Sequence, residues 1–580
     1  MTVTTADLRN FIDAEYNAQV KQVRAMWEQP LPTRIAEGEA VGPLSIVANG
    51  GGTLRLRCGV NLSKFREGDL LVLHRGDPTA HPHYECTLET DNGTELVIRA
   101  GFRESFWDID TVDGWLLDRG YADLRHILMG AITELEAPHA EPIRALLAGT
   151  MRAEFAPARV QAGMQRAIRL GFNASQQRAF AQAYAARNFA LIQGPPGTGK
   201  TLVLAHLAAA LAAEGQRVLV TAFTHRAINN ALRKIGKETG YRPVMKIGQR
   251  DRADDLAWDG GAVPNFERFG DCPYGKNQSG LIIGGTCFAV RTSRLQEVEF
   301  DTVIFDEASQ VTLPLAVAGM LAGRRYIFIG DHQQMPPVIV GEHANPAVTR
   351  SIFETLFTRE PGTMLDTTYR MNAAINVFPS RAFYGGRLRP DRRAAGRRLQ
   401  LNGVPAGALA HILDPAHPEV FVAVKHTRRT LRSPEEAELA AALTVEALRC
   451  GVPAREIAVV APYRAQGRQI RAMLHEALSG QPDALEEIVV DTVERIQGQE
   501  RDVIIISLTT SDPAHAAERA DFYFRPNRLN VALTRPRVKR IVLGSPSLLK
   551  ARPDDPEHSA WVKLFRALYE NSTVIPYPLR

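Results

Sequence analysis

The amino-acid sequence predicts an α/β protein with two parallel-sheet domains and a smaller β-rich unit in front of them. In two series, over residues 189–331 and 420–544, near-continuous apolar strands alternate with helical segments. Such strands are buried on both faces, as in parallel sheets covered by helices. Short runs of alternating polarity fill residues 44–102. A chain of 580 residues is too long for one compact core, which agrees with several domains.

The N-terminal part of the chain is predicted to be an accessory region with its own small β unit. Residues 1 to about 40 have a polar helical pattern. Between residues 44 and 102, strand-like runs such as TLRLRC and ELVIR are separated by turn-forming clusters such as ANGGG and REGD. Strands at this spacing indicate a small barrel or sandwich. Helical periodicity returns from about residue 120.

The composition argues against several classes of protein. No apolar run reaches the roughly 18 residues of a membrane span, and the N-terminus lacks the apolar segment of a secretory signal. We therefore expect a cytoplasmic protein with no membrane partner. The five cysteines are scattered without a C-x-x-C pair, which argues against a zinc module and a disulfide framework. The net charge of +5 is compatible with a polyanionic partner.

Two stretches of the chain are rich in arginine. They are RLRPDRRAAGRR at residues 387–398 and KHTRRTLR at residues 425–432. Each stretch is compatible with a solvated loop and with a surface that follows the phosphates of a nucleic acid. The sequence leaves both interpretations open.

A glycine-rich loop follows the first strand of the first series and opens an Ala/Leu-rich helix. It fits the pattern G-x-x-x-x-G-K-[ST], in which backbone N–H groups at a helix N-terminus wrap a phosphate. Lys200 would reach the β- and γ-phosphates of ATP, and the Thr201 hydroxyl would bind Mg²⁺. The predicted nucleotide-binding residues are Gly194, Pro195, Pro196, Gly197, Thr198, Gly199, Lys200 and Thr201.

Two acidic residues end the apolar strand TVIF. Asp306 would hold Mg²⁺ through water, and Glu307 would take the proton from the attacking water. Alone, an Asp-Glu pair at a strand end is a weak sign, but together with the glycine-rich loop it predicts ATP hydrolysis. Phosphoryl transfer depends on positioning and charge stabilisation. We therefore also expect a γ-phosphate sensor and arginines that reach in from elsewhere.

From about residue 170 to residue 550 the chain resembles superfamily 1 helicases, in the branch that contains the nonsense-mediated-decay helicase and senataxin. In the first domain, FNASQQRAF resembles the Q motif, RVLVTAFTHRAINNAL motif Ia, and GDHQQMPPV motif III. The segment LIIGGTCFA resembles the next segment that contacts nucleic acid. The resemblance implies that Gln176 reads adenine and Gln334 senses the γ-phosphate. It also implies nucleic-acid contacts by Thr224, His225 and Thr286.

The second domain carries the later motifs of the same branch. LDTTYRMNAAINVFPSRAFYGGRL resembles motif IV, VDTVERIQGQERDVIIIS motif V, and NRLNVALTRPRVKRIVLG motif VI. The resemblance implies that Arg370 and Arg535 are arginine fingers and that Tyr369 stacks on adenine. It further implies that Thr492 contacts a backbone phosphate and that Glu500 lies near the nucleotide.

The resemblance implies two RecA-like P-loop domains, over residues 171–345 and 346–580. Before them it implies an accessory region, residues 1–170, with a β-barrel at about 44–102 on a helical stalk at about 120–170. The interval from about 249 to 280 is expected to hold at most a loop. The implied activity is that of a single-strand-stimulated ATPase, a monomeric helicase or translocase on DNA or RNA. ATP and Mg²⁺ are its implied cofactors, and 5′-to-3′ its implied polarity.

Other functions remain to be weighed. The first alternative is an ATP-gated nucleic-acid-binding remodeller without strand-separating activity. A ring-forming ATPase that remodels proteins usually takes its finger from a neighbouring subunit, whereas this chain has both candidate arginines in cis. A degenerate, non-hydrolysing scaffold is disfavoured by the intact ATP-site residues. We find no restriction-type nuclease cluster in residues 1–170 or 551–580, so a nuclease would come from a partner protein.

Overall fold

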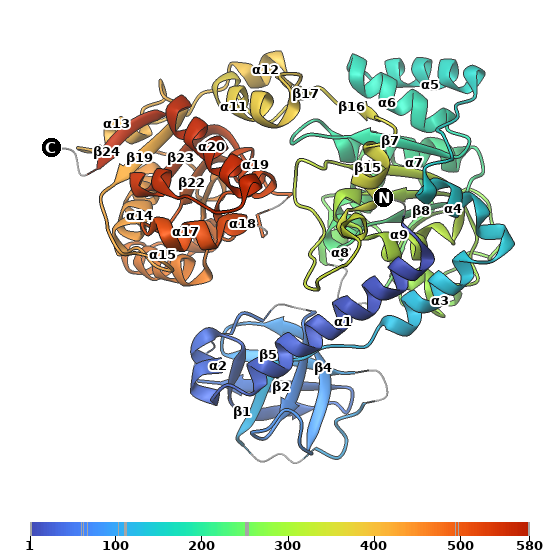
Figure 1. Ribbon diagram of the computed structural model, residues 1–580, viewed down its shortest axis with the longest axis horizontal. Helices are drawn as coiled ribbons and strands as arrows, with labels where there is room; N and C mark the ends of the chain where they lie inside the picture. Colours follow the sequence, from blue (N-terminus) through green and yellow to red (C-terminus); the bar gives the residue numbers. More distant parts are fainter. Residues whose placement is uncertain are drawn as a thin grey trace.

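The structure is a computed structural model with three parts: a barrel and two α/β domains (Figure 1). In this view the two domains lie side by side and the barrel lies below them. No helix among the described residues is long and apolar enough to cross a membrane. The structure describes residues 3–59, 61, 63–65, 68–101, 104–109, 113–249, 254–493, 495–496 and 498–577.

The N-terminal strands form a closed antiparallel barrel, so the predicted small β unit is confirmed as a barrel. Alternation in TLRLRC turns Leu54, Leu56 and Cys58 into the barrel core. The last strand, which closes the barrel against β1 and β3, lies beyond residue 102, so the predicted range was too short. In neighbour order the strands are β1 (Ala40–Asn49), β2 (Thr53–Cys58), β5 (Glu95–Ala100), β4 (His83–Asp91), β3 (Leu70–His74) and β6 (Trp115–Arg119).

The stalk consists of helices that precede and follow the barrel along the chain. The long helix α1 (Thr5–Trp27) runs from the first α/β domain to the barrel (Figure 1). At its start Leu8 and Ile12 share a core with the first domain. At its end the Trp27 indole donates to the Arg119 carbonyl of the barrel, at 3.0 Å. The other helices of this region are α2 (Leu31–Glu37), α3 (Arg125–Leu135), α4 (Glu141–Ala148) and α5 (Pro157–Arg169).

The first α/β domain is built on an eight-stranded parallel sheet, as the apolar strands predicted. Its neighbour order is β12 (Asn265–Phe266), β9 (Val244–Ile247), β13 (Ile282–Gly284), β8 (Val218–Thr221), β14 (Phe300–Phe305), β15 (Gly323–Gly330), β7 (Phe189–Gln193) and β16 (Thr363–Met364). The helices are α6 (Ala174–Ala185), α7 (Lys200–Ala213), α8 (His225–Thr239), α9 (Leu313–Met320) and α10 (Ile352–Phe357).

Two features of this domain differ from the expectation. The interval 249–280 holds more than a loop, because β10 (Ala257–Trp258) and β11 (Gly261–Ala262) pair as a hairpin and β12 extends the sheet. Residues 250–253 of that interval lie outside the described residues. The sheet also continues past residue 345, since β16 pairs with β7 and Phe353 of α10 lies in its core.

The second α/β domain has a six-stranded parallel sheet. Its order is β21 (Val489–Asp491), β20 (Ile457–Val460), β22 (Arg501–Ser507), β23 (Pro536–Gly544), β19 (Glu419–Val424) and β24 (Thr573–Tyr577). A small pair, β17 (Thr367–Thr368) and β18 (Arg389–Pro390), stands beside it. The helices are α11 (Ala373–Tyr384), α12 (Arg392–Ala395), α13 (Leu409–Leu413), α14 (Pro434–Arg449), α15 (Arg464–Ala477), α16 (Pro482–Glu487), α17 (Pro513–Glu518), α18 (Ala520–Tyr523), α19 (Pro526–Leu533) and α20 (Pro556–Asn571).

Candidate nucleotide site between the two domains

The glycine-rich loop connects β7 to α7 at the carboxyl end of the sheet. The Gly194 amide donates to the Gly330 carbonyl of β15 at 3.0 Å, which fixes the start of the loop. Gly197 and Gly199 have φ angles of 73° and 83°, a left-handed conformation that favours glycine. A Cβ on Gly194 would overlap the Lys200 side chain, which folds back across the loop. The loop is therefore shaped to hold a phosphate under Lys200.

The two acidic residues that follow β14 lie beside Lys200. The Lys200 ammonium is 3.5 Å from Glu307 Oε1, while Glu307 Oε2 is buried with no hydrogen-bond partner among the described residues. Glu307 has a φ of 47°, which is rare for a residue with a side chain and costs about 1–3 kcal/mol. Strained backbone of this kind is typical of functional sites.

The oxygen donors at this point fit a magnesium ion. Asp306 is buried, and the Glu307 amide donates to its Oδ1 at 3.0 Å. Burial and the neighbouring Glu307 charge together raise the pKa of the Asp306 carboxyl to about 7. A bound cation would reverse this penalty. Mg²⁺ prefers oxygen ligands and is commonly held by one or two carboxylates together with substrate phosphates, so Asp306 and Thr201 suit it.

Two arginines of the second domain lie close to the glycine-rich loop and the acidic pair. Arg370 lies against the loop, since a Cβ on Gly197 would overlap Arg370 Cβ. Its Nε donates to Glu500 Oε2 at 2.6 Å and its Nη1 to the Thr534 carbonyl at 3.1 Å. Burial would raise the pKa of Glu500, but the charges of Arg370 and Arg537 outweigh it and lower that pKa. Glu500 therefore stays ionised and holds the Arg370 guanidinium in place.

The second arginine is buried without a carboxylate in hydrogen-bond contact among the described residues. Arg535 is 2% exposed and donates only to neutral oxygens: the carbonyls of Val531 and Gln499, and Gln334 Oε1 at 3.4 Å. Burial, together with the positive charge of Arg370, lowers the pKa of Arg535 to about 9. Arg535 is thus a buried guanidinium without a carboxylate in direct contact among the described residues, and an anionic ligand would stabilise it.

Gln334 links the two domains through a buried network. Its amide donates to Asp331 Oδ2 at 2.8 Å while its oxygen accepts from Arg535. Tyr384 of α11 donates to the same Asp331 oxygen at 2.7 Å. Asn530 of α19 then donates to the Tyr384 hydroxyl and to the Gln333 carbonyl, each at 2.8 Å. Gln334 therefore contacts Arg535 of the second domain directly, and Asp331 connects it to Tyr384.

The residues expected to hold adenine lie together on the other side of the loop. The Gln176 amide donates to the Thr198 carbonyl at 3.0 Å, and its oxygen accepts from the Asn173 amide at 3.1 Å. Asn173 also donates to the Tyr369 hydroxyl at 2.8 Å, and the Tyr369 amide donates to the Gly197 carbonyl at 2.8 Å. The Tyr369 ring is 39% exposed, so it has room to stack on a base.

The threonines expected to contact nucleic acid follow strands at the carboxyl edges of the two sheets. Thr224 follows β8 and caps α8, and Thr286 follows the neighbouring β13 and accepts from the Ala289 amide. His225 begins α8 beside Gly248. In the second domain Thr492 follows β21 and is 7% exposed. Two residues of its motif, at positions 494 and 497, lie outside the described residues.

Sequence reasoning missed several residues that hold the site together. Thr368 donates to the Pro196 carbonyl at 2.8 Å. This hydrogen bond connects the segment that carries Arg370, called the finger segment below, to the glycine-rich loop. Arg397 donates to the carbonyls of Tyr369 and Arg370 at 3.0 and 3.3 Å. The repeated asparagines in NRLN were a possible signal, since Asn527 and Asn530 both reach backbone carbonyls of the Gln334 segment. Asp331 carried no signal beyond its place at a strand end.

Comparison with known proteins identifies the family of the two α/β domains. Two families, each described as an AAA domain, match residues 171–256 with 278–342 and residues 348–547, together more than half of the chain. The mouse "DNA replication ATP-dependent helicase/nuclease DNA2" is 29% identical over 425 residues, with 66% of this chain and 38% of the relative covered. The Saccharomyces cerevisiae protein of that name is 30% identical over 413 residues, with 66% and 26% covered.

The chain thus spans only 26–38% of the length of these curated relatives. Among solved structures, an arterivirus nonstructural protein 10 helicase covers 92% of this chain and 83% of its own, at 14% identity and a TM-score of 0.41. The placement in the branch of the nonsense-mediated-decay helicase and senataxin stays a prediction. The motif order, the paired AAA domains and the helicase relatives agree, and the chain belongs to the superfamily 1B helicases.

Proposed function

We propose that this chain hydrolyses ATP in the cleft between its two α/β domains and uses the cycle to move along single-stranded DNA or RNA. One observation carries the proposal. Lys200 and Glu307 of the first domain lie close to Arg370 and Arg535 of the second, and the buried Arg535 has no carboxylate in hydrogen-bond contact among the described residues. A triphosphate would give Arg535 an anionic partner. The names of the DNA2-type relatives, which include ATP-dependent helicase, support the same activity.

The geometry suggests how the residues divide the work. Lys200 would neutralise the β- and γ-phosphates, and Asp306 with Thr201 would hold Mg²⁺. When bound, Mg²⁺ would offset charge on the phosphate oxygens. Glu307 Oε2, which is buried and unpartnered among the described residues, is placed to accept the proton of the attacking water. Arg370 and Arg535 would stabilise the charge that develops on the transferred group.

Coupling to a strand would run through Gln334. When ATP is bound, Gln334 and Arg535 would both contact its γ-phosphate. The two α/β domains would then move closer together. Thr224, Thr286 and Thr492, at the carboxyl edges of the two sheets, would then grip backbone phosphates at altered spacing. A 5′-to-3′ polarity, a monomeric motor, a cytoplasmic location and a nuclease partner stay part of this proposal.

The proposal is tested by steady-state ATP hydrolysis with single-stranded DNA, single-stranded RNA and duplex compared side by side. We expect single strands to stimulate turnover and duplex to do so less. Strand displacement is assayed in parallel, because stimulation without displacement would favour the ATP-gated remodeller over the helicase. Equal turnover with and without every nucleic acid would contradict the proposal.

The arginine-rich stretch 387–398 is expected to serve the nucleotide cleft and not the strand. α12 lies on the side of the second domain away from the barrel (Figure 1), and Arg397 holds the finger segment. We predict that Arg397→Gln lowers turnover several-fold, since it removes two hydrogen bonds from a charged donor. Replacing the exposed Arg392 and Arg393 by glutamine should leave the salt dependence of strand affinity unchanged. Fluorescence anisotropy over a salt series decides, and a flatter slope in the double variant would overturn this assignment.

A further inference from the structure

The loop that follows Gln334 lies against one face of the stalk helix α1. Residues 335–345 form no helix or strand and lead directly from Gln334 to this contact. Asp7, Phe11 and Glu15 follow one another at intervals of four residues, so they share one face of α1. Each of the three contacts the loop. This face of α1 therefore holds the segment that begins at the predicted γ-phosphate sensor.

Glu15 binds the loop at three atoms. Its carboxylate accepts from the Val340 amide at 3.0 Å and from the Gly341 amide at 2.8 Å, and it lies 2.7 Å from His343 Nε2. A Cβ on Gly341 would lie 3.0 Å from Glu15 Oε1, so the loop backbone packs closely on the helix. His343 also stacks on the Phe11 ring, with centroids 4.6 Å apart. The loop therefore cannot shift at this point without α1 unless these contacts break.

The two ends of α1 are fixed to different parts of the molecule. Leu8 and Ile12 lie in the core of the first domain, whereas the Trp27 indole donates to a backbone carbonyl of the barrel. From Glu15 the helix continues to Trp27, which is about 18 Å at 1.5 Å per residue. A small tilt of α1 at Glu15 would therefore produce a larger displacement at the barrel.

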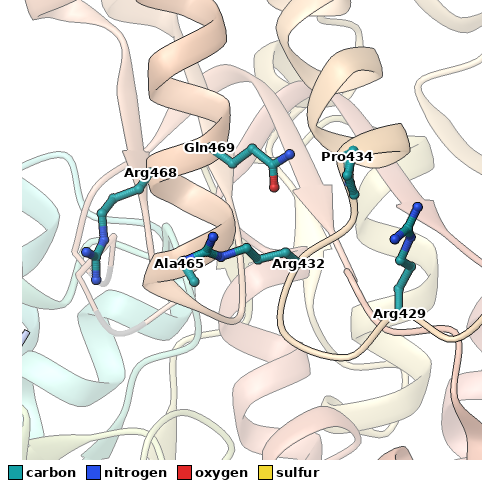
Figure 2. Close-up of a pocket in the computed structure, with 6 residues that line it drawn as sticks. All are labelled: Arg429, Arg432, Pro434, Ala465, Arg468 and Gln469. Atoms are coloured by element: carbon teal, nitrogen blue, oxygen red, sulfur yellow. The ribbon is translucent and has the colours of Figure 1, made fainter. Parts of the chain in front are cut away.

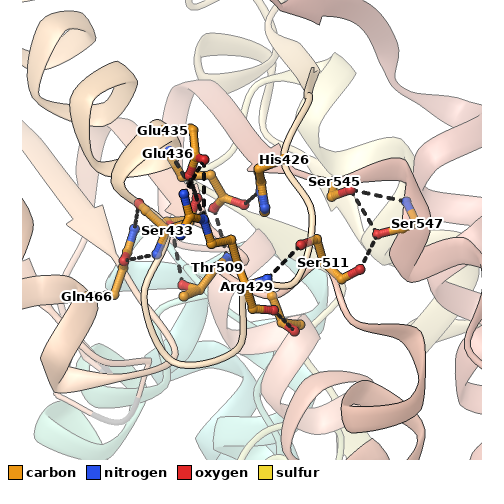
Figure 3. A network of polar contacts seen from close by, with 12 residues as sticks. His426, Arg429, Ser433, Glu435, Glu436, Gln466, Thr509, Ser511, Ser545 and Ser547 are labelled. Carbon is orange, nitrogen blue, oxygen red and sulfur yellow. Dashed lines mark hydrogen bonds and ion pairs between the residues drawn. The ribbon is translucent and has the colours of Figure 1, made fainter.

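The second domain also meets the barrel, at the start of α15. Arg464 donates to the Lys64 carbonyl, next to the barrel core, at 2.7 Å. Figure 2 shows the start of α15 beside the loop that carries Arg432. A buried network around Glu436 holds that loop (Figure 3), and the Glu436 carboxylate accepts from the Ser507 hydroxyl at 2.6 Å. Because such networks fix one conformation, the barrel contacts a well-held part of the second domain.

We propose that Glu15 is a positioning residue that passes movement of the loop after Gln334 to α1, so that ATP binding between the two domains moves the barrel. The inference rests on the proposed function, since it extends the coupling through Gln334. ATP would engage Gln334 and Arg535 at one end of the loop, and Glu15 holds the other end. Pro336 and Pro337 have restricted φ angles and stiffen the residues between.

The test compares Glu15→Gln with the matched control Glu28→Gln, which removes the same charge from an exposed position at the end of the same helix. The amide that replaces the Glu15 carboxylate has one acceptor oxygen in place of two, so one donor of the loop loses its partner. Nucleotide affinity and turnover without nucleic acid are measured first. Both should match the wild-type values, because Glu15 contacts none of the residues predicted to bind ATP.

Barrel movement is followed by fluorescence energy transfer. The fluorophores are attached to Asn92→Cys in the barrel and Lys237→Cys in the first domain, both exposed positions. Cys272→Ser removes the half-buried thiol, and the other four cysteines are buried. Transfer is recorded without nucleic acid, before and after addition of a non-hydrolysable ATP analogue. We expect the analogue to change transfer in the wild-type background and in Glu28→Gln, and most of this change to be lost in Glu15→Gln.

The outcomes separate this inference from the proposed function. An equal change of transfer in Glu15→Gln and the wild-type background would overturn the role of Glu15. So would a wild-type background without any change, since there would be no barrel movement to pass on. If Glu15→Gln alters the nucleotide-free transfer, the melting temperature and the unstimulated turnover together, Glu15 only supports the fold and the inference is also overturned. The proposed function is decided separately, by whether single strands stimulate wild-type turnover.

Discussion

Glu307→Gln is expected to bind ATP and single strands but to lose turnover by about 10²- to 10⁴-fold, the usual contribution of a general base. The amide keeps the shape and the left-handed backbone of Glu307 but cannot take a proton from water. Asp306 is untouched, so binding of Mg²⁺ and nucleotide should survive. Hydrolysis is followed by phosphate release, and nucleotide affinity by a fluorescent ATP analogue.

Lys200→Ala is the comparison for this variant. It removes the charge that lies across the loop, so both hydrolysis and nucleotide binding should fall. The pair separates chemistry from binding within one site. Near-normal turnover in Glu307→Gln would remove this residue from the catalytic role, and unchanged nucleotide affinity in Lys200→Ala would show that the loop does not hold the phosphates.

Arg535→Ala and Arg370→Ala are each expected to lose about 10³-fold or more in strand-stimulated turnover, the range known for arginine fingers. Nucleotide-free binding of single strands should remain, because neither side chain lies at the carboxyl-edge threonines. Each variant should also lose the change in strand affinity that a non-hydrolysable ATP analogue causes in the wild-type protein. A ligand shifts a two-state equilibrium only by its differential affinity for the states.

The two arginines differ in their surroundings, which gives an internal control. Arg370 is held by Glu500, whereas Arg535 is held by neutral oxygens and by Gln334. Removal of Arg370 takes away the partner of Glu500 at 2.6 Å and leaves the ion pair with Arg537 at 3.4 Å, so this variant is also expected to lower the melting temperature. Arg535→Lys keeps the positive charge but loses the planar set of guanidinium N–H donors. If this variant restores only part of the turnover, the donor geometry of Arg535 matters as well as its charge. Wild-type turnover with a wild-type affinity shift in either alanine variant would rule out that residue as a finger.

Local patterns in the sequence predict the residues of the candidate ATP site. The glycine-rich loop and the two acidic residues after TVIF can be found from short stretches of sequence. Their geometry depends on the local backbone conformation and on where one strand ends. The sequence could not show that Glu307 adopts a left-handed φ, or that Thr368 and Arg397 fasten the finger segment to the loop. Those contacts join residues far apart in the chain and depend on how the domains pack.

The accessory region illustrates the same limit. The alternation of TLRLRC predicted strands, but closure of the barrel depends on β6, whose WLLDR sequence has no polar alternation because it is buried nearly throughout. The interval after α8 was expected to be a loop, since strands of two residues leave no periodic pattern. The roles of the individual site residues stay predictions until the variants are measured.

The central claim is that one chain contains a complete ATP site, with Lys200 and both arginines acting in cis. Mixing Lys200→Ala with Arg535→Ala at equal concentration tests it most directly, with strand-stimulated hydrolysis as the readout. If the site is built within one chain, each chain of the mixture lacks one essential group, and turnover should equal the average of the two inactive variants at every protein concentration. Turnover that rises well above either variant on mixing would mean that the finger is supplied by a neighbouring subunit, and the two-domain mechanism would be contradicted.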